Sequence, residues 1–178
     1  SESVKDDFDI PVQRDAEYTL RYLEARLDEI SGVFTDKKAD MHLTTPEAVF
    51  DMSKDIWRVA KANVCLALGN YAEAMSCLQQ IADSGRYALD SGNEYEPGDG
   101  TIMHLIVADE VMQGHSIGYY SYADVLLTLA ECNIVTGNDA KASVLIRQVA
   151  EAKDMTVCGN NIDDMAKLRR QLFIPRYF

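Results

Sequence analysis

The chain has 178 residues, of which 47% are apolar and 26% charged, enough apolar material for a soluble domain with a real core. A formal net charge of -12 and a pI of about 4.6 disfavour nucleic acids and anionic lipid surfaces, because both bind basic faces. The largest basic groupings are Lys37-Lys38 and Arg169-Arg170. No apolar run approaches the roughly 20 residues that a membrane-spanning helix needs.

The first predicted helix runs from about Pro11 to Ser31, with Gly32 as its stop. Apolar residues there recur in steps of three and four, which is the spacing of one helical face: Ala16, Leu20, Leu23, Leu27 and Ile30. Thr45-Pro46 is typical of a helix start, since proline at the first helical position loses no hydrogen bond. It predicts a second helix that reaches Leu68.

The dipeptide Gly69-Asn70 predicts a tight turn. Glycine tolerates the left-handed conformation that ends many helices, and asparagine can cap the next helix. Glu73 stands in the capping-box position. A third helix is therefore expected to follow and to end near Ser84-Gly85.

The stretch 91–100 holds glycines, a proline and acidic residues, which predict a loop. Residues 101–112 are apolar without a clear period; such runs fit a helix or a strand, and we favour a helix. Helical spacing returns over 119–135. Gly137-Asn138 then repeats the earlier turn and starts another helix, and a last helix is expected from Ile162 to Phe173.

An internal repeat relates the two turns. Gly69 and Gly137 are 68 residues apart, twice the 34-residue period of tetratricopeptide (TPR) units. At this offset small and apolar residues coincide: Ala62 with Ala130, Ala74 with Ala142, Leu78 with Ile146, Ile81 with Val149, and Ala82 with Ala150. Small side chains beside a turn let two helices approach closely. The repeat predicts an all-α fold of TPR-like antiparallel hairpins, at about 46–85 and 119–153, in one domain spanning 1–178.

Residues able to carry chemistry are scattered. The cysteines fit no zinc or redox motif, and Cys65, Cys77 and Cys132 lie on apolar helical faces, so we interpret them as buried small side chains. The histidines, at 42, 104 and 115, have no partner one turn away, and the acidic loop lacks the EF-hand pattern. Ser116 has no nucleophile elbow around it. The sequence predicts no catalytic residue, no metal site and no cofactor.

Aromatic platforms are the functional feature that we favour, because the flat faces of sugars rest on tyrosine or tryptophan rings. Tyr95 falls in the acidic loop, and Tyr119 and Tyr120 precede a predicted helix. Trp57 is on a predicted helix, where packing in the core is the commoner role. We name these four as candidate ligand-binding residues.

Two segments resemble the helical hairpins of SusD/RagB-type nutrient-binding lipoproteins. The first, 61–90, reads KANVCLALGNYAEAMSCLQQIADSGRYALD and ends in the family's Ser-Gly-x-Tyr-x-Leu exit. The second, 120–137, reads YSYADVLLTLAECNIVTG, and its Tyr-Ala-Asp-Val-Leu-Leu run is similar to a family helix. Arg176-Tyr177-Phe178 resembles the start of a following family stretch. The resemblance covers most of this chain, whereas typical members are much longer.

The resemblance implies a binding protein on the outer face of a Bacteroidetes-type outer membrane. Such a protein partners a SusC-like TonB-dependent transporter and delivers oligosaccharide, or peptide in some relatives. It is held by a lipidated N-terminal cysteine, and since no such cysteine lies near Ser1, we expect the anchor to be missing from this chain. An acidic surface is compatible with a neutral glycan.

A TPR-type adaptor for protein–protein interaction is the alternative. Such adaptors clamp peptide carboxylates with asparagine or basic side chains, for which Asn63 and Asn133 are available. The acidic charge argues against an acidic peptide. A hydrolase is a third possibility, supported only by dispersed carboxylates.

Overall fold

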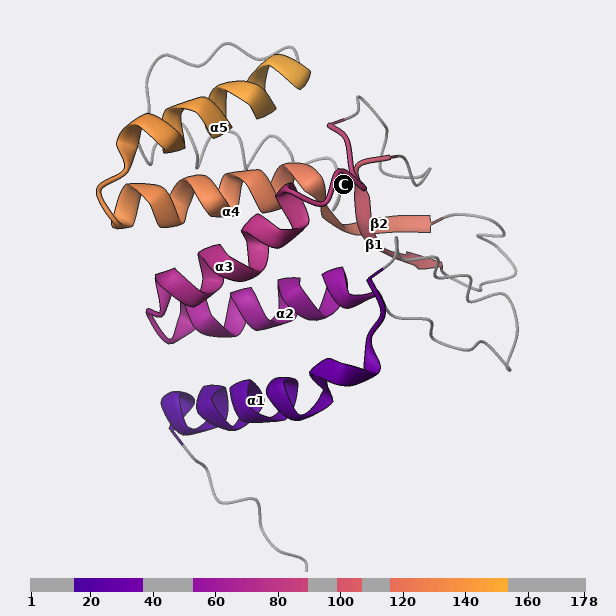
Figure 1. Cartoon of the computed structure of the whole chain (residues 1–178), viewed down its shortest axis with the longest axis vertical. Helices are drawn as coiled ribbons and strands as arrows, with labels where there is room; N and C mark the ends of the chain where they lie inside the picture. Colours follow the sequence, from indigo (N-terminus) through magenta and orange to yellow (C-terminus); the bar gives the residue numbers. More distant parts are fainter. Residues whose placement is uncertain (1–14, 37–52, 90–98, 107–115, 154–178) are drawn as a thin grey trace, which may run out of the picture.

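The computed structural model describes residues 15–36, 53–89, 99–106 and 116–153. In these ranges helices predominate, as expected, and one pair of strands accompanies them (Figure 1). The elements in chain order are α1 (Ala16–Ile30), the 3-10 helix η1 (Ser31–Val33), α2 (Lys54–Ala67), α3 (Tyr71–Ala82), β1 (Thr101–Ile106), β2 (Ser116–Ser121), α4 (Tyr122–Val135) and α5 (Asp139–Ala152). Within that described part, no helix combines the length and apolar character needed to cross a membrane.

The α-helices stack in chain order along the longest axis of the molecule (Figure 1). Each packs on the next, α1 on α2, α2 on α3, α3 on α4 and α4 on α5. The turns that join α2 to α3 and α4 to α5 lie on one side of the stack, and the strands lie on the other. This is the side-by-side arrangement of helical hairpins that the internal repeat predicts.

The two turns are built alike. Gly69 and Gly137 adopt φ values of 74° and 78°, the left-handed region in which glycine has no Cβ penalty. In each turn the glycine N–H donates to the carbonyl three residues back, and the next N–H donates to the carbonyl five residues back, which is the Schellman motif. The pairs are Gly69 to Leu66 (2.9 Å), Asn70 to Cys65 (2.8 Å), Gly137 to Ile134 (3.0 Å) and Asn138 to Asn133 (2.7 Å).

The residues matched by the repeat form the core. All but one of them are buried, and most are fully so: Ala62, Ala74, Leu78, Ile81, Ala130, Ala142, Ile146, Val149 and Ala150. Ala82 is half-buried against the same cluster. The alanines beside each turn therefore occupy the close approach between paired helices, as expected.

Helix α4 is the centre of the stack. Every residue from Ala123 to Ala130 is buried, because α3, α5 and β2 all pack against this helix. A helix that is apolar on all sides is stable only when other elements surround it. Ser121 and Asp124 form a complete capping box at its start. The predicted cap of α3 is also present, where the Asn70 side chain accepts the Glu73 N–H at 3.3 Å.

The prediction of a helix over 101–112 is wrong for residues 101–106, which form β1. This strand pairs antiparallel with β2, with bulges between Thr101 and His104. Its apolar run is short and β-branched at both ends, so local pattern alone does not separate strand from helix. Residues 119–121 likewise belong to β2, and α4 begins at Tyr122.

Several expectations lie outside the described residues. They are most of the loop 91–100, residues 107–112 and the helix Ile162–Phe173. The predicted starts of the first two helices, at about Pro11 and at Thr45-Pro46, are too early, because Asp15 and Ser53 are extended and cap helices that begin at Ala16 and Lys54. Within the described residues, α1 ends before Gly32 and α2 ends before Gly69, as predicted. Cys65, Cys77 and Cys132 are buried, also as predicted.

Candidate functional site

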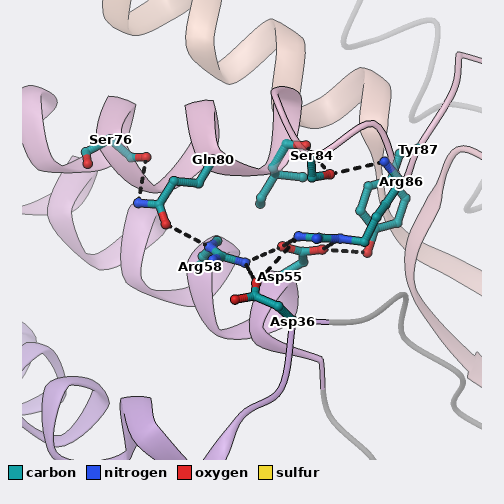
Figure 2. Close-up of polar contacts among 9 residues, drawn as sticks. Asp36, Asp55, Arg58, Ser76, Gln80, Ser84, Arg86 and Tyr87 are labelled. Carbon is teal, nitrogen blue, oxygen red and sulfur yellow. Dashed lines mark hydrogen bonds and ion pairs between the residues drawn. The ribbon is translucent and has the colours of Figure 1, made fainter.

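A buried carboxylate, Asp55 near the start of α2, is the centre of a polar cluster (Figure 2). Arg86 donates to both of its oxygens, from Nε to Oδ2 and from Nη2 to Oδ1, each at 2.9 Å. The hydroxyl of Tyr87 donates to Oδ2 at 3.0 Å, and Arg58 Nη1 donates to Oδ1 at 2.7 Å. Asp55 is fully buried, so these bonds replace the water that its charge has lost.

Arg58 extends the cluster to two further segments. Its Nη1 donates to Asp36 at 2.6 Å, just after η1, and its Nε donates to Gln80 on α3 at 3.2 Å. The Gln80 amide donates in turn to the carbonyl of Ser76 at 3.2 Å. The cluster thus joins α2, α3, the exit that follows α3 and the segment that follows α1.

The charges within the cluster balance, since two guanidinium groups face the carboxylates of Asp36 and Asp55. Burial alone would lower the pKa of Arg58, but hydrogen bonds to both carboxylates outweigh it and raise that pKa. The hydrogen bond from Arg58 lowers the pKa of Asp36. Arg58 and Asp36 are therefore held in their ordinary charged forms at neutral pH.

Tyr87 completes this junction. Burial, together with the nearby charge of Asp55, raises its pKa to about 12, so the phenol stays a hydrogen-bond donor. Its ring stacks on that of Tyr122, with centroids 6.3 Å apart, and the Tyr122 hydroxyl donates to the carbonyl of Ala82 at 3.4 Å. The exit motif Ser-Gly-Arg-Tyr therefore fastens α2 to α4 through its last two side chains.

The arrangement is better suited to holding these segments together than to carrying out a reaction. A general acid or base needs a pKa near the working pH, whereas the shifts resolved in this cluster strengthen the ordinary protonation states. A metal would have to displace guanidinium groups from Asp55. Across the described ranges, no group of three or more histidine, cysteine or acidic side chains is placed to hold a metal ion.

The exposed aromatic residues lie elsewhere, on α1. Tyr18 and Tyr22 are one helical turn apart and 48% and 51% exposed, which leaves half of each side chain to contact a partner. The Arg26 guanidinium lies 5.2 Å from the centroid of the Tyr22 ring, and its Nε donates to the Tyr22 hydroxyl at 3.1 Å. Tyrosine and arginine are the residues that most often anchor protein interfaces. We call Tyr18, Tyr22 and Arg26 the α1 aromatic face.

Sequence reasoning missed this face and the Asp55 cluster. The face had a signal, because Tyr18, Tyr22 and Arg26 follow one another at four-residue steps, off the leucine stripe. In the Asp55 cluster only the pair Asp55–Arg58 has a local spacing, three residues apart, whereas Arg86 is 31 residues from Asp55 and gives no local signal.

The structure describes the side chains of two of the four predicted ligand-binding residues, Trp57 and Tyr120. Trp57 is half-buried and faces α1, where its Nε1 donates to the carbonyl of Leu27 at 2.7 Å. Tyr120 packs against the core, and its hydroxyl lies 3.4 Å from that of Thr128 on α4. Tyr119 is in β2, and Tyr95 lies outside the described residues. Ligand contact by these residues stays a prediction.

Comparison with known proteins bears on the fold. No protein-family profile matches the sequence, and no curated protein matches it significantly. A solved structure does match: a SusD superfamily protein from Bacteroides fragilis superposes with a TM-score of 0.66 over 89% of this chain, at 15% identity. The chain has the SusD-like fold. It spans 52% of the length of that protein, about half.

The SusD-like fold accounts for the two similar hairpins and for the exit motif that follows the first of them. Both hairpins, the Gly-Asn turns and the Ser-Gly-Arg-Tyr exit occur in the order that the resemblance implies. The fold also places the exit motif, because Arg86 and Tyr87 both reach Asp55. At 15% identity the likeness concerns the fold, and the ligand and the partner are separate questions.

Proposed function

We propose that this chain belongs to a non-catalytic, nutrient-binding accessory protein that works with a SusC-like TonB-dependent transporter. The observation that carries the proposal is the SusD-like fold over 89% of the chain. The resemblance of both hairpins and of the exit motif to SusD/RagB sequences supports it from an independent direction. The proposed ligand is an oligosaccharide, with a peptide as the rarer case.

The helical stack supplies a rigid scaffold in this proposal. Its core is continuous from α2 to α5, and the Asp55 cluster fixes the exit of the first hairpin against it. Rigid elements hold a binding surface more accurately than loops do. The α1 aromatic face, at one end of the stack (Figure 1), is the surface that we propose for contact with the transporter.

The charge of the molecule fits a neutral ligand. At -12, the protein repels phosphates and acidic peptides at long range, whereas a neutral oligosaccharide is indifferent to this field. We propose Tyr119 and Tyr95 as ligand contacts. Tyr120 and Trp57 are weaker candidates, because both already make contacts inside the fold.

Location at the cell surface is part of the same proposal. A SusD-type protein is held at the outer face of the outer membrane by a lipid on an N-terminal cysteine. In this proposal the protein contacts the membrane through such a lipid anchor alone.

Binding can be tested by calorimetry against a panel of neutral oligosaccharides. We expect binding to at least one of them, weakened at least tenfold by Tyr119→Ala through loss of a stacking platform, about 1.4 kcal/mol. Tyr18→Ala is the matched control, since it removes an exposed tyrosine at the far end of the stack and should leave the affinity unchanged. Absence of binding to every sugar, with binding to peptides instead, would favour the adaptor.

The structure weakens one support of the adaptor alternative. Asn133 is a candidate clamp for a peptide carboxylate, but it is buried and its side-chain amide donates to the carbonyl of Leu129 at 2.8 Å. Asn63 is exposed on α2. The pair is therefore not presented together on one accessible surface.

A further inference from the structure

Helix α1 is attached to the stack differently from its neighbours. Of the described α-helices, it alone has no buried residue. Leu23 and Ile30, from its apolar stripe, are each 43% exposed, so even the side that carries the stripe is only partly covered. Burial of apolar side chains stabilises the packing of α2 to α5, but it contributes little to the attachment of α1.

The seam between α1 and α2 is made largely by polar side chains. Three residues at successive turns of α2 contact α1: Trp57, Lys61 and Cys65. Lys61 Nζ donates to both oxygens of Asp28, at 2.7 and 2.8 Å, and lies 3.7 Å from Glu24. Trp57 donates to the Leu27 carbonyl at 2.7 Å, and the Cys65 thiol contacts Glu24 at 3.6 Å.

Lys61 makes the main ion pair between α1 and α2, with Asp28, and we call this pair the Lys61 latch. Its side chain is only 5% exposed, although its partner Asp28 is 58% exposed. Burial by itself lowers the pKa of Lys61, but hydrogen bonding and the charge of Asp28 outweigh it, so the pKa is raised. Glu24 and Asp28 on α1, with Cys65 on α2, are the other titratable groups that face it. When α1 moves away, Lys61 regains water, which offsets much of the lost ion pairing.

The two ends of α1 are not equally secured. After η1, Thr35 pairs with Ser53 in an isolated bridge, and the Lys54 N–H donates to the Thr35 carbonyl at 2.8 Å. Asp36 is bonded to the buried Arg58. The polar contacts that α2 makes across the seam reach only residues 24–28, in the second half of the helix. Attachment of α1 is therefore concentrated toward its C-terminal end.

We propose that α1 is a hinged flap, anchored at residues 31–36, whose opening uncovers the α2 strip of Trp57, Lys61 and Cys65. The closed state is held by the Lys61 latch. The open state presents one cation, one indole N–H and one thiol along a single face of α2. Opening of α1 leaves α2 to α5 folded, because their shared core does not include a residue of α1.

The rate at which the Cys65 thiol is alkylated measures the opening of α1. It is fully buried in the closed state, and burial raises the pKa of its thiol to about 12, so it reacts very slowly there. Cys132, fully buried on α4, serves as the internal control. It becomes accessible only when the stack itself unfolds.

The test is the alkylation rate of each thiol, followed by mass spectrometry in a Cys158→Ser background. Asp28→Asn removes the main partner of the latch, and we expect Cys65 to react about fivefold faster, as for an ion pair worth about 1 kcal/mol. Adding about 0.5 M NaCl should speed the reaction of Cys65 in the parent protein, because salt screens the latch. Cys132 should keep its rate in both experiments.

Glu17→Gln is the matched control, since it removes the exposed pair with Arg21 on the same helix and leaves the seam intact. It should change no rate. If Glu24 substitutes for Asp28, the double variant Glu24→Gln/Asp28→Asn removes both partners and must show the effect. The flap would be refuted if Cys65 stayed as slow as Cys132 in that double variant, or if both thiols accelerated together.

Discussion

Gly69 and Gly137, 68 residues apart in the sequence, occupy the same place in two copies of one turn. Each glycine closes a Schellman motif with hydrogen bonds of nearly equal length. The copies share conformation, bonding and flanking alanines, so the hairpins are two instances of one structural unit. Their equivalence makes a quantitative prediction.

Replacing either glycine by alanine should destabilise the protein by a similar amount, about 1–2 kcal/mol, because a Cβ at positive φ is strained. Nothing lies within 4 Å of the added Cβ at either site, so the cost is conformational rather than steric. Urea unfolding followed by circular dichroism measures it. Gly32→Ala is the control, since Gly32 has equal space and no positive φ. A cost at Gly32 equal to that at Gly69 would contradict this explanation.

Small side chains beside the turns should be as important as the turns themselves. Ala74→Leu and Ala142→Leu each insert bulk where two helices meet, and overpacking of this kind costs about 1–3 kcal/mol. Ala72→Leu adds the same bulk at an exposed site of α3 and should be close to neutral. Thermal unfolding of the three variants checks this, and similar melting temperatures for all three would count against close packing at the alanines.

The Asp55 cluster should be costly to break at its centre. Asp55→Asn keeps the size of the side chain but leaves Arg58 and Arg86 without their shared charge, which we expect to cost about 3–5 kcal/mol. Tyr87→Phe removes one hydrogen bond to the same carboxylate and should cost about 1 kcal/mol. Chemical denaturation separates the two, and equal effects would mean that the ion pairs add little.

Tyr87 should make the stability of the protein fall in alkali. Its pKa in the folded protein is about 12, above the ordinary value of 10.0. A raised folded pKa stabilises the fold below pH 10, and that contribution is lost as the pH rises toward 12. The advantage of the parent protein over Tyr87→Phe should therefore shrink across this window. A difference in unfolding free energy that stays constant with pH would contradict the environment described for Tyr87.

The features that can be predicted from the sequence are those that neighbouring residues decide. The Gly-Asn turns, the Asn70 cap and the buried alanines follow from spacings within one hairpin. The helix predicted over 101–106 is wrong because a short apolar run takes its conformation from its partner, and β2 lies further along the chain. The Asp55 cluster is invisible in the sequence for the same reason, since it exists only after distant segments meet.

The candidate site is harder to predict than the fold. The sequence correctly places Trp57 on a helix, but its bond to Leu27 depends on where α1 lies. The sequence shows that Tyr18 and Tyr22 lie off the leucine stripe of α1, but their exposure depends on what packs against that helix. Exposure depends on how all the helices pack together, so the sequence of one segment does not determine it.

Association of this SusD-like chain with a transporter is the central claim. The most direct measurement is co-purification of the tagged protein from mild-detergent extracts of its native membranes, with mass spectrometry of whatever accompanies it. We expect a TonB-dependent outer-membrane barrel at near-equal amounts, reduced by the double variant Tyr18→Ala/Tyr22→Ala and unaffected by Val144→Ala on α5. Recovery of the tagged protein without any such barrel, from cells that express TonB-dependent transporters, would contradict the claim.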